Sequence, residues 1–194
     1  MWVIKLISEK EILNDQKEYF AKDNTLSFQF RLEKLKKLKK NIIAYEDELK
    51  VALYKDLGKS EIESYASEIG FVLASITHTI RNLKKWMKPE KKKMPITLFP
   101  SKSMIIKEPY GVVYIIGQYN YPFQLLIEQL IGEIAAGNCA VLSPSKLAPS
   151  VSELTKKIIK DTFEYDYILV LMVGLRITQF YKMQDLIVYF LLEM

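Results

Sequence analysis

Polar side chains gather behind two short apolar segments, and they are the residues best placed to contact a ligand. The segments are residues 112–116 and 139–142, each a run of β-branched, aromatic or small apolar residues typical of a buried strand. Ligands of parallel sheets bind outside the carboxyl ends of the strands. The polar groups that follow the two segments are Gln118, Tyr119 and Asn120 after Gly117, and then Ser143, Ser145 and Lys146.

The chain between these segments predicts a helix. Residues 123–136 are apolar with interspersed Gln and Glu, and Gly137-Asn138 ends the stretch with two residue types that tolerate a positive φ. Strand, helix and strand make a βαβ unit, which requires a parallel sheet and a right-handed crossover. We therefore expect an α/β fold with both polar groups on one edge of the sheet.

The chain has one thiol and one imidazole, and neither predicts a reactive site. Cys139 lies inside the second apolar segment, as a buried structural cysteine would. His78 lies in a helical stretch with no Cys or second His nearby, so no metal site is expected. A single cysteine cannot form an internal disulfide, which favours a reducing cytoplasm.

The N-terminal half predicts helices over residues 16–40, 41–57 and 60–87, because apolar residues recur there at steps of three and four. Gly58 is a natural helix end, and Ser60 with Glu63 forms a capping box. The lysines between residues 34 and 40 are expected on a solvated helix face. A further helix is expected over residues 151–160, and a strand from Asp166 onward.

Residues 91–107 predict an exposed pair of strands, near residues 96–99 and 103–108. Pro95 and Pro100 exclude a central position in a sheet, so both should be edge strands. No apolar run approaches the ~20 residues needed to span a bilayer, so no membrane span is expected.

Residues 16–168 resemble the aldehyde dehydrogenases, most closely the fatty-aldehyde, class 3-like type. The motifs that carry the resemblance occur in the family's order along the chain. They are Asp56-Leu57-Gly58-Lys59-Ser60, Trp86-Met87-Lys88-Pro89, Pro100-Ser101-Lys102-Ser103, Glu108-Pro109-Tyr110-Gly111-Val112-Val113, Asn120-Tyr121-Pro122-Phe123, Ala135-Ala136-Gly137-Asn138-Cys139 and Pro144-Ser145.

The resemblance implies oxidation of an aldehyde to a carboxylate with NAD or NADP. A Cys thiolate attacks the carbonyl, hydride passes to the nicotinamide, and water hydrolyses the thioester. The family's N-Y-P asparagine, which donates its NH2 group to the developing oxyanion, matches Asn120. From the residues alone, Asn120 is equally a turn residue before Tyr121-Pro122. The cofactor-binding positions that the resemblance implies are Ile116, Gly117, Gln118, Tyr119, Ser143, Ser145 and Lys146.

Several residues depart from the family pattern. Ser143 and Lys146 replace a Lys and a Glu that lie near the adenosine ribose, and Lys146 cannot accept a hydrogen bond. A cation there favours the 2′-phosphate of NADP, whereas the loss of the first Lys favours NAD, so the choice stays open. Gln118-Tyr119 replaces Pro-Trp. Glu128-Gln129 and Glu133 occupy apolar positions of the helix, where a buried Glu133 needs a partner.

The resemblance also divides the chain. Residues 1–168 match the N-terminal part of an NAD(P)-binding domain, incomplete and Rossmann-like, with an edge arm over about residues 94–108 that adds to a partner subunit's sheet in a homodimer. Residues 169–194 do not match. One back-translation of residues 185–194, read from its third base, gives F-D-C-I-F-L-T-G-N, which resembles the family's continuation. The tail is therefore expected to follow a frameshift, a hypothesis that reading the gene in all three frames from the codon of Ile168 would test.

Three functions are consistent with these features. The first is a truncated aldehyde dehydrogenase that is inactive alone, because the family's catalytic Cys and Glu have no counterpart. The second is a non-catalytic interaction protein that pairs its edge arm with a full-length subunit. The third, a basic helical binding module, has little support, because the net charge of +5 comes from helical lysines and no base-reading motif occurs. No nucleic-acid partner is expected.

Overall fold

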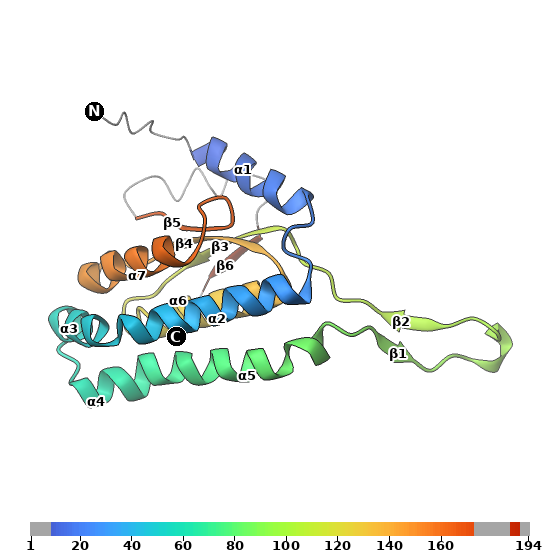
Figure 1. The fold of residues 1–194 in the computed structure, drawn as a ribbon, viewed down its shortest axis with the longest axis horizontal. Coiled ribbons are helices and arrows are strands. Elements are labelled where there is room, and N and C mark those ends of the chain that lie inside the picture. The colour runs from blue at the N-terminus through green and yellow to red at the C-terminus, as the bar shows by residue number, and fades with distance from the viewer. Residues whose placement is uncertain (1–8, 173–186, 191–194) are drawn as a thin grey trace.

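The computed structural model describes residues 9–172 and 187–190 (Figure 1). Helices dominate the first half of the chain and alternate with parallel strands in the second. The helices are α1 (Glu9–Ala21), α2 (Phe28–Ala44), α3 (Glu46–Leu57), α4 (Glu61–Ser64), the π-helical turn η1 (Tyr65–Ile69), α5 (Gly70–Trp86), the 3-10 turn η2 (Ile96–Leu98), α6 (Gln124–Ala136) and α7 (Pro149–Thr162). The strands are β1 (Glu90–Lys92), β2 (Ser103–Ile105), β3 (Val112–Ile116), β4 (Cys139–Ser143), β5 (Ile168–Val170) and β6 (Ile187–Phe190).

The main sheet confirms the predicted α/β fold. Four parallel strands lie in the order β5-β4-β3-β6, and α6 is the crossover between β3 and β4. Helix α6 packs against both of these strands, and α2 and α5 pack against α6 in turn. In Figure 1, α1 lies above the sheet and the layer of α6, α2 and α5 lies below it. The buried side chains of α6 and the strands form one continuous core with those of α2, α3, α5 and α7.

The prediction of one helix over residues 16–40 was wrong. Helix α1 ends at Ala21, Asp23 adopts a φ of 58°, and Ser27 begins α2 by accepting a hydrogen bond from the backbone N–H of Phe30. The turn signal Asp23-Asn24-Thr25 was present in the sequence, because Asp and Asn are residues that tolerate the left-handed region. The next boundary was also misplaced, since α2 continues to Ala44.

The predicted helix over residues 60–87 contains an unpredicted π-helical turn. Its start was predicted correctly, because Gly58 has a φ of 67° and Ser60 accepts from the N–H of Glu63 at 3.2 Å. Between α4 and α5 the backbone widens over Tyr65–Ile69. A Cβ on Gly70 would lie 2.8 Å from the carbonyl oxygen of Tyr65, so only glycine fits at the end of this turn.

The arm is a two-stranded antiparallel hairpin whose first strand lies at other residues than predicted. Glu90 pairs with Ile105, whereas residues 96–98, expected as a strand, form a 3-10 turn at the tip. The two prolines explain the error, because residues 95 and 100 lack the N–H groups that a ladder needs and flank the turn. The second predicted strand, residues 103–108, is confirmed only over residues 103–105. The hairpin projects from the body of the molecule (Figure 1).

The carboxyl end of α6 is closed by a buried cation. Arg31, on α2, donates from Nη1 to the carbonyl of Ala135 at 2.9 Å and from Nε to the carbonyl of Thr25 at 2.9 Å. Gly137, with a φ of 93°, ends the helix as predicted. Positive charge near the last carbonyls of a helix is stabilising, because those carbonyls have no partners within the helix.

The residues after Gly137 join α6 to both strands. Asn138 accepts from the N–H of Gly111 at 2.9 Å and donates its NH2 group to the Glu133 carboxylate. Glu133 therefore has the partner that its burial demanded. Burial raises the pKa of Glu133, and the hydrogen bond from Asn138 opposes that rise.

Only part of the predicted tail is described. Strand β5 lies where a strand was expected, and residues 187–190 pair in parallel with β3. Residues 173–186 and 191–194 lie outside the described residues, so the frameshift over residues 169–194 stays a prediction.

Gly137→Ala is expected to lower the free energy of unfolding by about 1–3 kcal/mol. A side chain is strained at a φ of 93°, and the added Cβ would lie 2.4 Å from Arg31 Nη2. Urea unfolding followed by circular dichroism measures the change.

Gly132→Ala is the matched control within the same helix. Apart from the helix's own backbone and the two chain neighbours, no atom lies within 4 Å of a Cβ at this exposed position, so the change should stabilise the protein by roughly 0.5–1 kcal/mol. Equal effects of the two substitutions would contradict the assigned helix end.

Candidate functional site

The structure brings the two predicted polar groups together at the carboxyl edge of the sheet. Ile116 and Ser143 are register partners at the ends of β3 and β4, and the N–H of Gly117 donates to the carbonyl of Ser143 at 2.9 Å. A Cβ on Gly117 would lie 3.3 Å from Leu126 Cδ1 and 3.5 Å from Pro144 Cα. The glycine therefore lets the loop after β3 approach both α6 and the loop after β4.

The predicted cofactor positions differ in what they can offer to a ligand. Tyr119 and Lys146 are exposed, and Ile116, Gln118 and Ser145 are half-buried. Ser145 Oγ accepts from the N–H of Leu147 at 3.3 Å, so its hydroxyl helps to shape the loop.

A phosphate-bearing dinucleotide fits this edge in part. The exposed cation of Lys146 and the close backbone approach at Gly117 suit a ligand with phosphate groups. Ser143 is only 1% exposed, so its hydroxyl is not available on the surface.

Asn120 combines the two roles that the sequence left open. Its side-chain Oδ1 accepts from the N–H of Tyr121 at 3.1 Å, which is the turn role. Its NH2 group donates to no residue in the described part of the chain, and the residue is exposed. The amide oxygen thus shapes the turn, and the amide nitrogen keeps both hydrogens available as donors.

An ion pair that sequence reasoning missed lies directly behind this turn. Lys59 Nζ contacts Glu68 Oε1 at 2.5 Å and donates to the carbonyl of Asn120 at 3.0 Å. The same ammonium lies 4.1 Å from the ring centroid of Tyr121. The side chains of Lys59 and Glu68 are 9% and 0% exposed, so the pair is shielded from water.

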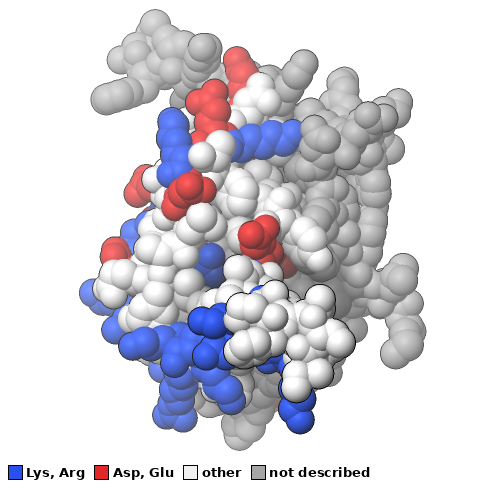
Figure 2. All heavy atoms as spheres, turned by 90° about the vertical axis from the view of Figure 1, so that its right-hand side faces the viewer, with Lys and Arg blue, Asp and Glu red and all other residues white. Residues whose placement is uncertain are grey.

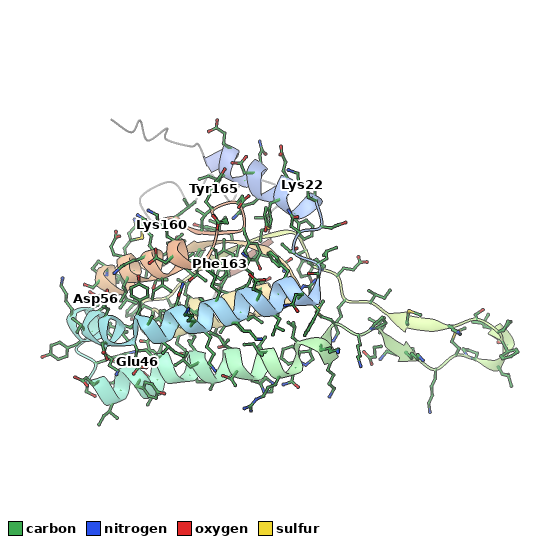
Figure 3. All side chains as sticks on the ribbon, in the orientation of Figure 1. Lys22, Glu46, Asp56, Lys160, Phe163 and Tyr165 are labelled. Carbon is green, nitrogen blue, oxygen red and sulfur yellow. The ribbon has the colours of Figure 1, made fainter. Side chains whose placement is uncertain are left out.

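The motif that contains Lys59 also holds a second helix. Asp56 Oδ2 accepts from the N–H of Val151 at 2.8 Å and so caps the first turn of α7. Figure 3 shows Asp56 at the end of α3, where α7 begins. The signal for these roles was the Asp56–Ser60 motif, but the motif does not state which distant backbone groups its side chains reach.

The structure confirms Cys139 as a buried residue. The thiol is 0% exposed, and burial, with a smaller contribution from Asp166, raises its pKa to about 12. A thiol with so high a pKa is not a nucleophile near neutral pH.

Two other features of the described chain bear on function. His78 lies on the exposed side of α5, with its ring 5.7 Å from that of Trp86, and the described residues contain no cluster of His, Cys, Asp or Glu able to hold a metal ion. Within the same residues, no helix combines the length and the apolar content that crossing a membrane requires.

Glu128, which departs from the apolar pattern of its helix, also has a partner. Its Oε1 accepts from Ser75 on α5 at 2.7 Å, whereas its Oε2 is buried without a hydrogen bond among the described residues. This contact joins α5 to α6 one turn of α6 beyond Gln124, the residue that bonds to Glu68.

Comparison with known proteins gives one consistent result. The model of the aldehyde dehydrogenase family matches residues 9–174. The 4,4′-diaponeurosporen-aldehyde dehydrogenase of Staphylococcus aureus is 49% identical over 165 residues, which are 85% of this chain and 36% of that protein.

Solved structures agree with this match. The substrate-bound state of Staphylococcus aureus AldH superposes with a TM-score of 0.86 at 46% identity, over 93% of this chain and 38% of that one. The glyceraldehyde-3-phosphate dehydrogenase GapN of Methanocaldococcus jannaschii, solved with NADP, shares the fold with a TM-score of 0.72 at 24% identity, over 84% of this chain and 36% of that one.

The chain thus spans between 36% and 38% of the length of these three proteins. Within that length, the family match covers strands β3, β4 and β5, the Asn120 turn and the buried ion pair behind it. On this evidence, the chain belongs to the aldehyde dehydrogenase family.

Proposed function

We propose that this chain supplies the oxyanion donor and part of the cofactor edge of an NAD(P)-dependent aldehyde dehydrogenase. The observation that carries the proposal is Asn120, whose NH2 group is exposed and has no partner among the described residues. Attack of a thiolate on an aldehyde builds negative charge on the carbonyl oxygen, and a fixed N–H donor stabilises that charge. In this chain Asn120 is the donor at the sheet edge.

The cofactor edge consists of the residues that follow β3 and β4. When bound, NAD or NADP accepts the hydride that aldehyde oxidation releases. The backbone near Gly117 receives the ligand closely, and Lys146 is the cation available to a phosphate group. The remaining positions proposed to line the edge are Ile116, Gln118, Tyr119, Ser143 and Ser145.

The nucleophile is not among this chain's residues. Cys139 is its only cysteine, and its thiol is buried with a raised pKa. The chain alone is therefore proposed to be inactive, and turnover requires a thiolate and a general base from outside it.

An exchange of segments tests the role of Asn120. Residues 1–168 are placed in the Staphylococcus aureus relative instead of its matching segment, and aldehyde-dependent NADH or NADPH fluorescence is followed. The hybrid should turn over, and Asn120→Ala should lower kcat by about 10²–10³-fold, because one oxyanion donor is lost.

Asn82→Ala is the control, since Asn82 bonds only within α5, to the carbonyl of His78 and its ring. An inactive hybrid, or a hybrid in which Asn120→Ala keeps its kcat, would count against the proposal. Saturable, aldehyde-dependent reduction of NAD or NADP by the 194-residue chain alone would show that the chain is active and that the inactivity claim is wrong.

The arm favours an additional role in association with a second copy of this chain. Both strands of the hairpin are exposed along their whole length, and Ile96 and Phe99 at the tip are 91% and 83% exposed. Figure 2, which faces the arm, shows uncharged side chains with Lys and Arg around them. An unpaired hairpin edge offers backbone N–H and C=O groups to another strand, and its apolar tip adds surface to bury.

Ile96→Lys combined with Phe99→Lys should therefore convert associated protein to monomer while leaving the melting temperature of the monomer unchanged. Both side chains are exposed, so the core loses no contact. Sedimentation velocity gives the mass. Ile62→Lys, at another exposed apolar position, is the control. A wild-type chain that is monomeric at high micromolar concentration would refute the assignment.

A further inference from the structure

The buried pair Lys59–Glu68 uses nearly all of its hydrogen-bonding capacity on one short turn. Glu68 Oε2 accepts from the N–H groups of Phe123 and Gln124, both at 3.0 Å, while Oε1 contacts Lys59. Lys59 in turn holds the carbonyl of Asn120. Removing two charges from water costs several kcal/mol per ion unless such bonds compensate it. The pair thus connects to both sides of the turn that carries Asn120.

The amino end of α6 has no cap from its own sequence. Phe123 occupies the cap position and cannot accept a hydrogen bond from the first turn. Glu68 provides that acceptor from the π-helical turn, and its negative charge also suits the positive end of the helix dipole. The start of α6 therefore depends on a carboxylate that lies 55 residues earlier in the chain.

The π-helical turn explains how Glu68 reaches this position. Glu68 is the fourth residue of this turn, whose wider spacing alters the direction of its side chains relative to those of a regular α-helix, and such turns are frequent at functional sites. Gly70 maintains it, because a Cβ there would meet the Tyr65 backbone. Glu68 is buried against the start of α6. Directly after this turn, α5 continues from Gly70 as a regular α-helix.

We infer that Lys59 and Glu68 are positioning residues for Asn120, which rests on the proposed oxyanion role of that asparagine. Lys59 fixes the backbone at Asn120 by donating to the carbonyl of that residue. Glu68 fixes the start of α6 by accepting from the N–H groups three and four residues after Asn120. A donor must be held close to its productive geometry to stabilise charge in a transition state, so this anchoring matters to the reaction. Neither Lys59 nor Glu68 contacts substrate in this assignment.

NMR relaxation of the labelled 194-residue chain tests the inference without cofactor or aldehyde. In the wild-type chain, the backbone order parameter of Asn120 should be about 0.85, as in rigid backbone. Lys59→Met should lower it below about 0.6, and Lys59→Arg, which keeps a donor and a charge, should restore most of it.

Lys59→Met leaves Glu68 charged and buried, so that variant can fail to fold. The double variant Lys59→Met with Glu68→Gln removes both charges and keeps similar volumes, which buried pairs often tolerate. It should fold and still show the lowered order parameter. An Asn120 order parameter near 0.85 in the folded double variant would overturn the inference.

Two controls separate positioning from general destabilisation. Ile76→Val, in the buried face of α5, costs about 0.5–1.5 kcal/mol, removes none of the hydrogen bonds that hold the turn, and should leave Asn120 rigid. Lys157→Met breaks the exposed ion pair with Glu48 and should also leave the backbone of Asn120 rigid. A failure of the oxyanion proposal appears instead in the kinetics of the hybrid enzyme, so the two ideas can fail separately.

Discussion

Helix α6 depends on two charged side chains that belong to other helices. Glu68 closes its amino end and Arg31 closes its carboxyl end, and each sign suits the end of the helix dipole that it meets. The helix has no side-chain cap of its own at either terminus. Because α6 joins β3 to β4, the Glu68 contact holds the loop that follows β3 at the carboxyl edge of the sheet, and the Arg31 contact holds the turn that leads into β4 at the opposite edge. The layer of α2 and α5 is thus part of the site's construction as well as of the core.

The segment from Asp56 to Ser60 shows how few residues achieve this arrangement. Asp56 caps α7, Gly58 turns the chain through the left-handed region, Lys59 holds the Asn120 turn, and Ser60 begins α4. The contacts of Asp56, Lys59 and Ser60 are all with backbone groups, which are present whatever the neighbouring side chains are. The family motif at this place therefore has a physical reason, since each of its polar residues satisfies a specific helix end or turn.

Sequence patterns predicted the parts of the fold that local chemistry controls. Apolar runs predicted β3, β4 and the helix between them to within a residue or two. The conformational freedom of glycine predicted the helix ends at Gly58 and Gly137. The break between α1 and α2 was missed because the helix predicted from the apolar residues after Leu32 was extended back across a turn of Asp and Asn. The arm's first strand was misplaced because apolar composition was weighed above proline chemistry.

The ion pair could not have been predicted in the same way. Lys59 and Asn120 are 61 residues apart, and Glu68, which lies in an unpredicted π-helical turn, bonds to the start of α6 from 55 and 56 residues earlier. A sequence states residue types and local spacing, whereas this contact exists only after the helices have packed. The candidate donor Asn120 was identified from a motif, but the residues that hold it became visible only in three dimensions.

Native-state hydrogen exchange of the whole chain tests this account most directly, because it reports the stability of each end of α6 separately. If charged side chains from neighbouring helices hold this helix, the amides of Phe123 and Gln124 should open with free energies close to that of global unfolding. Exchange of these two amides as fast as that of the exposed arm strand Ser103–Ile105 would mean that the helix start frays and that Glu68 does not hold it.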